Sequence, residues 1–178
     1  FYEAHLANRG KEQAQYISPM RDAIDRGLHP TNHTDFYVAP LDQMFMLWSA
    51  VNRVSRGGAE VGLDQRVTPL EGLKAMTIWG AEQYGEQDSK GSLEPGKLAD
   101  LVILDRNPLA VEPMAIDSIK VVETIKEGAT VFVMSDAERK KETSGTQSQD
   151  PGSESLSNAL LASARAKPLK ALSPGFTP

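Results

Sequence analysis

The chain has 178 residues, of which 40% are hydrophobic, and its 24 acidic and 19 basic side chains give a net charge of −5. This composition suits a globular protein with a polar extension, and its mild acidity gives no electrostatic footprint for nucleic acid. No stretch approaches the ~18 consecutive apolar residues of a membrane-spanning helix. We therefore expect neither a nucleic acid nor a membrane as a partner. The absence of cysteine excludes disulfides, thiolate nucleophiles and thiolate metal sites.

The start of the chain and its first elements come next in order. The chain opens at Phe1 without an initiator methionine or a targeting pattern, which indicates the later part of a longer protein. The sequence leaves the compartment open, with the cytoplasm as the working expectation. Ser18 as N-cap, a proline at the first helical position and Gly27 as a stop predict a short helix. Residues 28–33, LHPTNH, are predicted as a strand, although Pro30 favours an edge or irregular structure.

Two longer helices are predicted next. Residues 41–56 carry apolar side chains at three- and four-residue spacing, which indicates an amphipathic helix that ends at the glycine pair 57–58. The tetrapeptide TPLE at 68–71 has the pattern of a capping box with proline at the first helical position. Both tryptophans, Trp48 and Trp79, fall on these helices, and we expect them to pack in the core.

The pattern then changes to strands and finally to a polar tail. In GSLEPGKLADLVILD, residues 91–105, a Pro-Gly turn precedes the apolar run 101–104, which predicts a buried strand. Residues 119–133 predict a hairpin that turns at 127–128 and joins the same small sheet. Residues 135–178 are charged and serine-rich, which predicts disorder, with a weak helical docking segment at 156–172 as the alternative.

The segment NHTDFYVAP, residues 32–40, carries the candidate chemistry. His33 and Asp35 lie two positions apart, between the predicted strand and the following helix. By residue type alone, an aspartate in this place is more often a helix N-cap than a catalytic group. The chain contains no His-x-His pair, no His-Glu-x-x-His motif and no glycine-rich phosphate loop. Its three histidines cannot assemble a complete metal site by their spacing.

Several stretches taken together point to a family. They are SPMRDAIDRGLHPTNHTD, RVTPLEGLKAMTIWGAEQYG, GSLEPGKLADLVILD and VVETIKEGATVFV. In this order they resemble the C-terminal part of the metal-dependent amidohydrolase superfamily, in its YtcJ-like branch, amidohydrolase family 3. The resemblance covers residues 1 to about 133, and GSLEPGKLADLVILD is its most specific element. That element is specific to the superfamily and not to a substrate.

The resemblance implies an α/β fold. Residues 1–90 would supply the last strands and helices of a (β/α)8 TIM barrel, and residues 91–134 would be strands of a small β-sandwich domain. The barrel of such an enzyme has its active site at the carboxyl ends of the strands. A whole barrel of this kind typically has ~250 residues, so it cannot fit in this chain. The missing N-terminal portion is therefore the first partner implied, and a homo-oligomer is a further possibility.

The resemblance also implies a site. Asp35 matches the family aspartate after the eighth strand, which contacts a divalent metal, typically one or two zinc ions, whose other ligands would lie upstream of Phe1. In that role the carboxylate accepts a proton from the attacking water and passes it to the leaving amine. His33, Phe36 and Tyr37 are the candidate substrate-binding residues. His33 could line the pocket or support a site residue from outside the ligand shell, and a structural histidine with a satisfied hydrogen bond is the alternative. For Phe36 and Tyr37 the alternative is packing against the next helix.

The implied function is hydrolysis of carbon–nitrogen, amide-type bonds in a small-molecule substrate, with the isolated chain inactive. The competing interpretation is a non-catalytic fragment or pseudoenzyme module that contributes packing or oligomer contacts. The two interpretations differ in what they expect of Asp35, because only the enzyme needs its carboxylate.

Overall fold

The computed structural model describes residues 2–36 and 38–137. Phe1–Ser135 form one compact unit, and the second unit, Asp136–Pro178, is described only at its first two residues. The predicted disorder of the tail and its possible helix therefore lie outside the described residues. The boundaries expected at residues 90 and 134 remain predictions.

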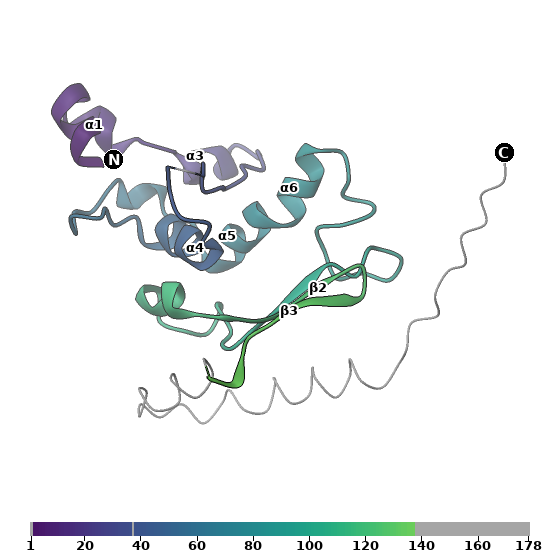
Figure 1. The fold of residues 1–178 in the computed structure, drawn as a ribbon. Coiled ribbons are helices and arrows are strands. Elements are labelled where there is room, and N and C mark those ends of the chain that lie inside the picture. The colour runs from purple at the N-terminus through teal and green to yellow at the C-terminus, as the bar shows by residue number, and fades with distance from the viewer. Residues whose placement is uncertain (1, 37, 138–178) are drawn as a thin grey trace. The chain divides into compact units, whose positions relative to one another are not determined.

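The first unit contains short helices followed by three strands (Figure 1). In chain order the elements are α1 (Tyr2–Arg9), α2 (Lys11–Gln15), α3 (Met20–Asp25), α4 (Gln43–Asn52), the 3-10 helix η1 (Leu63–Gln65), α5 (Pro69–Met76), α6 (Ile78–Gln83), β1 (Leu101–Leu104), the 3-10 helix η2 (Pro113–Ser118), β2 (Val121–Lys126) and β3 (Ala129–Val133).

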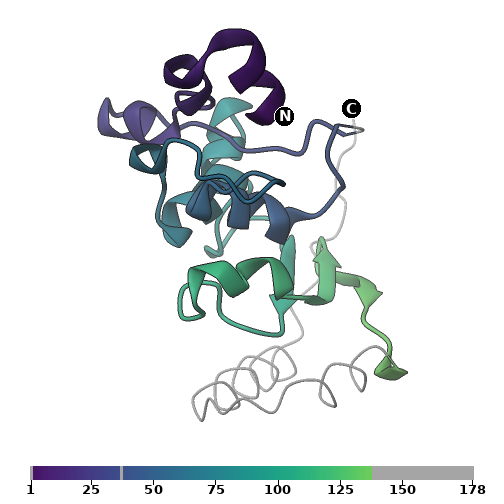
Figure 2. The same cartoon turned by 90° about the vertical axis from the view of Figure 1, so that its left-hand side faces the viewer.

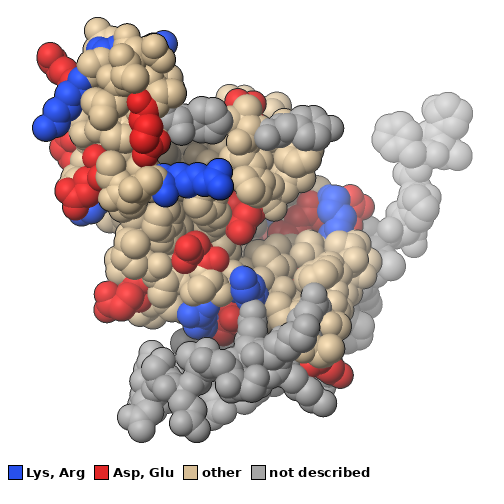
Figure 3. Space-filling view, turned by 60° about the vertical axis from the view of Figure 1, so that its left-hand side comes forward, with Lys and Arg blue, Asp and Glu red and all other residues tan. Residues whose placement is uncertain are grey.

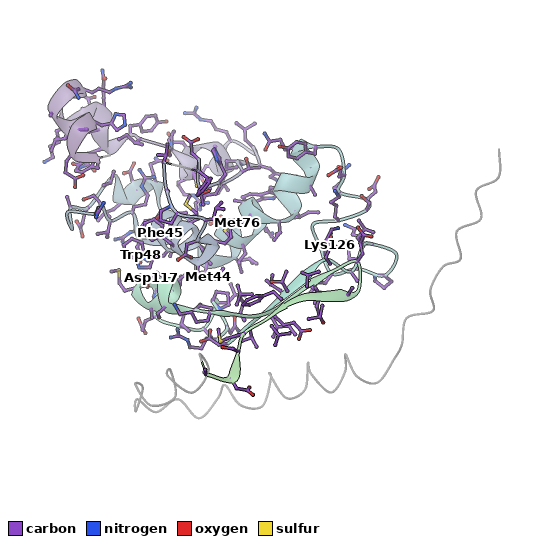
Figure 4. All side chains as sticks on the ribbon, in the orientation of Figure 1. Met44, Phe45, Trp48, Met76, Asp117 and Lys126 are labelled. Atoms are coloured by element: carbon purple, nitrogen blue, oxygen red, sulfur yellow. The ribbon has the colours of Figure 1, made fainter. Side chains whose placement is uncertain are left out.

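Helix α4 forms the centre of the core, because it contacts both α5 and η2. Figure 2 shows the same adjacency of α4 and η2 from the side. Leu47 of α4 and Ile116 of η2 are the largest fully buried side chains, and Met76 of α5 packs against their cluster (Figure 4). A Cβ atom added to Gly72 of α5 would lie 2.5 Å from Leu47 Cδ1, so the glycine lets the two helices approach closely.

The helix after Pro19 ends as predicted and begins one residue later than predicted. Gly27 has a φ of 76°, its N–H bonds to the carbonyl of Ile24, and the next N–H bonds to the carbonyl of Ala23. These two bonds make a Schellman motif, which satisfies the last carbonyls of the helix. The predicted cap Ser18 is wrong, because Pro19 is the N-cap of α3 and no side chain caps this helix.

The predicted strand at 28–33 is not formed in the described part of the chain. The segment is extended, but its backbone bonds to helices: the N–H of Asn32 donates to the carbonyl of Ala75, at 3.2 Å. Its side chains also contact a helix, α6. Thr31 bonds to Gln83, and the ring of His29 stacks on Trp79 with centroids 4.9 Å apart. A strand needs a neighbouring strand, and within residues 2–36 and 38–137 none lies beside this segment.

The helix predicted over 41–56 is shorter than expected. Asp42 caps it, and Arg53 ends it in the left-handed conformation, with a φ of 53°. Beyond Arg53 the chain turns back on itself, with Val54 bridging Glu60 around the glycine pair that was expected to stop the helix.

The capping box at the start of α5 is confirmed. The backbone N–H of Thr68 donates to Glu71 Oε2 at 2.8 Å, and the N–H of Glu71 returns the bond to Thr68 Oγ1 at 3.2 Å. Glu71 also binds Arg21 of α3, with Nη2 and Oε1 2.5 Å apart. Burial acts to raise the pKa of Glu71, but the bonds from Thr68 and the charge of Arg21 outweigh it and lower the pKa.

The three strands form one antiparallel sheet in the order β1-β2-β3, which confirms both the predicted strand and the predicted hairpin. Glu127 and Gly128 at the turn both have positive φ, as a two-residue type I′ turn requires. The expected burial of 101–104 is wrong on one face. Val102 is 53% exposed, and Phe132, two strands away in the same row, is 47% exposed, because no described residue covers that face.

Two aspartates of the GSLEPGKLADLVILD stretch bracket β1 and tie it to β2. Asp100 accepts a hydrogen bond from Lys126 Nζ and another from the backbone N–H of Glu127, both at 2.7 Å. Asp105, at the other end, accepts from the backbone N–H of Lys120 at 2.8 Å. Figure 4 labels Lys126 at the turn end of the sheet. The aspartates thus fix both ends of the pairing between the strands.

The contacts of Asp100 predict that the stability of the fold depends on pH. The hydrogen bond from Lys126, then that from Glu127, lowers the pKa of the Asp100 carboxyl. A lowered folded-state pKa stabilises the fold above the unfolded-state pKa, and this contribution is lost as the pH falls through the folded-state value. Asp100→Asn in the full-length protein should therefore lower the urea midpoint near neutral pH, and the difference from wild type should shrink in acid.

The matched control is Asp117→Asn on η2, whose exposed carboxylate has no ion pair among the described residues (Figure 4). This control should follow wild type across the pH range. A gap between Asp100→Asn and wild type that stays constant down to acid pH would contradict the assignment.

Candidate functional site

Asp35 begins a tight turn between the extended segment and α4. Its φ is 50°, in the left-handed region that aspartate tolerates better than most residues. Both of its backbone polar groups are bound. The N–H donates to Nδ1 of His33 at 3.0 Å, and the carbonyl accepts from the N–H of Val38 at 2.6 Å. The position of Asp35 is thus set through its main chain.

The alternative that Asp35 caps the following helix is wrong. The N-cap of α4 is Asp42, whose Oδ1 accepts the backbone N–H of Phe45 at 3.0 Å. Asp35 lies in the turn before that cap. Its carboxylate therefore has no part in starting the helix.

The Asp35 carboxylate is exposed, and no hydrogen bond or ion pair within residues 2–36 and 38–137 engages it. An unengaged carboxylate is a ligand suited to a divalent cation. In the same part of the chain, no group of three or more His, Asp or Glu side chains could hold a metal ion. The residues present therefore fit a metal as one contributed ligand, and they do not form a complete centre.

The other predicted site residues divide into three cases. His33 is exposed and in direct contact with Asp35. Phe36 is 52% exposed beside them, in the same turn. Tyr37 lies outside the described residues. The structure thus brings His33, Asp35 and Phe36 together in one turn, and their roles stay predictions.

The apolar character of the rest of this turn was not predicted from the sequence. Val38 and Leu41 are both more than half exposed, following Phe36 along the chain. The signal was present, because residues 36–41 read FYVAPL without a charge. On the face shown in Figure 3, acidic and basic side chains are interspersed. The six residues that follow Asp35 in the chain therefore carry no charge.

Comparison with known proteins places the chain in a family. Residues 2–132 match the pattern described as "Amidohydrolase family". The chain belongs to the amidohydrolase family. The resemblance drawn from its sequence segments is confirmed. Within the described residues, no helix has the length and apolar character needed to cross a bilayer.

Individual relatives agree with this assignment. An N-substituted formamide deformylase of Arthrobacter pascens is 31% identical over 121 residues, which are 67% of this chain and 22% of that protein. A protein named as amidohydrolase YtcJ of Bacillus subtilis (strain 168) is 23% identical over 126 residues, 69% of this chain and 24% of the relative. This chain thus spans less than a quarter of the length of either relative.

One solved structure is similar as well. An amidohydrolase from Thermotoga maritima MSB8 aligns with a TM-score of 0.49 and 23% identity, over 65% of this chain and 26% of that one.

Proposed function

We propose that this chain is the C-terminal portion of a metal-dependent hydrolase that cleaves carbon–nitrogen bonds of the amide type. Membership of the amidohydrolase family supports the reaction class. The single observation that carries the proposal is the state of Asp35, whose backbone is bound on both sides while its carboxylate is exposed and unengaged by the described residues. A carboxylate held in this way suits proton transfer and metal contact.

The same proposal extends to the fold. Residues 1–90 would be the last units of a (β/α)8 barrel, with 28–33 at the position of the eighth strand, and residues 91–134 would belong to a small β-sandwich. Two features support it: the extended segment is held by helices and has no strand partner among the described residues, and β3 is an exposed edge. The partner would be the remainder of the same protein, which would supply the missing strands.

The metal would be a divalent ion, with zinc favoured, held by Asp35 together with ligands outside the described residues. When bound, such an ion supplies Lewis acidity for water and for the amide carbonyl. Asp35 takes a proton from the attacking water as the water oxygen bonds to the carbonyl carbon. It then delivers that proton to the nitrogen as the carbon–nitrogen bond breaks, so that a neutral amine leaves.

The turn after Asp35 favours a substrate with an apolar group on the amide nitrogen. Phe36, Tyr37, Val38 and Leu41 offer no charge to a ligand, and three of these are described as strongly exposed. An apolar substituent resting there would lose water-exposed surface on binding. The similarity to an enzyme named for N-substituted formamides supports the same class.

Removal of metal from the full-length protein tests the proposal. The loaded protein should hydrolyse an N-benzyl or N-alkyl formamide to the amine and formate, and dialysis against a chelator should abolish turnover until zinc is restored. Amine release and metal content by elemental analysis are the measurements. Turnover that survives complete metal removal would reject the metal-dependent mechanism.

The isolated 178-residue chain is the comparison sample, and it should be inactive with or without zinc. Loaded full-length protein that fails to hydrolyse a panel of amides would favour the non-catalytic module instead.

A further inference from the structure

The contact between His33 and Asp35 has a fixed direction. The donor is the backbone N–H of Asp35, so Nδ1 of His33 must be the acceptor, 3.0 Å away. A neutral imidazole that accepts at Nδ1 carries its proton on Nε2. The ring therefore engages the main chain of Asp35 and does not touch its carboxylate through this bond.

The bond stabilises an unfavourable backbone conformation at Asp35. Asp35 has a φ of 50°, a region that costs an L-residue free energy unless its surroundings over-determine it. The bond from His33 holds the amide side of the residue, and the bond from Val38 holds its carbonyl side. Neither bond uses an oxygen of the Asp35 carboxylate.

We propose that His33 is a positioning residue, whose Nδ1 fixes the left-handed backbone of Asp35 and so aims the carboxylate at the reacting atoms. The substrate-binding role expected of His33 is thereby replaced by a role exerted through Asp35. This inference rests on the proposed function, because it needs Asp35 to be the acid–base group. It goes beyond that function in giving a task to a residue outside the proton transfer.

Two substitutions in the loaded full-length protein separate the acceptor from the ring. His33→Asn removes the ring but supplies a side-chain oxygen that can accept the N–H two residues on, as in an Asx turn. His33→Phe keeps the ring and removes the acceptor. His33→Ala removes both. Because the His33 side chain is exposed, all three variants should fold, and loss of one hydrogen bond should lower the unfolding temperature of the Phe and Ala variants by no more than a few degrees.

The positioning role predicts that kcat falls about 10- to 100-fold in His33→Phe and His33→Ala, since small misplacement of a catalytic group has effects of that size. KM should change little in His33→Phe, and His33→Asn should restore most of the lost kcat. Loss of zinc to a chelator provides a readout that is independent of turnover. Zinc should leave the Phe and Ala variants faster than wild type, and leave the Asn variant at nearly the wild-type rate.

Wild-type kcat and zinc retention in His33→Phe would overturn the positioning role, as would an Asn variant as impaired as the Phe variant. Asp35→Asn in the same assays keeps this outcome distinct from failure of the proposed function. If Asp35→Asn is inactive and His33→Phe is unimpaired, only the positioning role fails. If Asp35→Asn turns over normally, the proposed function fails with it.

Discussion

Asp35→Asn is expected to reduce turnover of the loaded full-length enzyme at least ~100-fold, the loss typical of a positioned acid–base group. Asparagine has the same shape and tolerates the left-handed backbone at this position, where φ is 50°. Its amide cannot accept the proton from water or balance the charge of a metal ion. The free energy of unfolding should stay within about 1 kcal/mol of wild type, as for most exposed substitutions. Steady-state kinetics and urea denaturation on the same samples measure both.

Asp42 provides the matched control, because it is the aspartate that does cap α4. Asp42→Ala should cost about 1 kcal/mol of stability through loss of the cap, and it should leave turnover unchanged. Asp42→Asn should preserve both properties, since asparagine caps as well as aspartate. Near-wild-type turnover in Asp35→Asn would remove the only acid–base residue assigned to this chain.

Arg53→Leu is expected to destabilise the fold by at least about 3 kcal/mol, because it removes three charge-assisted hydrogen bonds and leaves the carbonyls of Ile17 and Val61 without the donor that Arg53 supplies. Arg53 is only 9% exposed, and its guanidinium reaches three carbonyls from two separate segments. Nε donates to Val61 at 2.7 Å, Nη1 to Ser18 at 3.0 Å and Nη2 to Ile17 at 2.6 Å. A fall in the urea midpoint of the full-length protein, at unchanged slope, is the expected measurement.

Arg53→Lys should lie between wild type and Arg53→Leu, because a single ammonium group cannot span three carbonyls as the planar fork does. Arg56→Leu is the surface control, since this arginine is exposed, and it should change stability by less than about 0.5 kcal/mol. If Arg53→Leu unfolds at the wild-type urea concentration, the three bonds do not hold these segments together.

Features with a local cause were predicted well from the sequence. The capping box at Thr68 and Glu71, the stop at Gly27 and the turn at Glu127-Gly128 each depend on a few neighbouring residues, and each is present. The run 101–104 is a strand because its apolar residues are short in extent and bounded by turns.

Features that depend on distant residues were predicted less well. The helix after Asp42 ends at Arg53 because its side chain is held by carbonyls around Ser18 and Val61, which nothing in the local pattern indicates. Residues 28–33 were predicted as a strand in spite of Pro30, but a strand also depends on a neighbour to pair with.

The candidate site was predicted in part. Proximity of His33, Asp35 and Phe36 followed from their positions in the sequence. The distinction between a cap and an unengaged carboxylate did not, although Asp42, just before the apolar stripe of α4, carried the usual N-cap signal. The direction of the bond from Asp35 to His33 required coordinates.

The left-handed backbone at Asp35 also limits how this position can change by mutation. Asparagine and glycine are two residues that accept such a backbone more readily than most. Both are one nucleotide away from either aspartate codon, asparagine by a change in the first base and glycine by a change in the second. Single-base changes can therefore remove the carboxylate and leave the fold intact, and under the proposed function a descendant with Asn or Gly there would be a folded protein without its acid–base group.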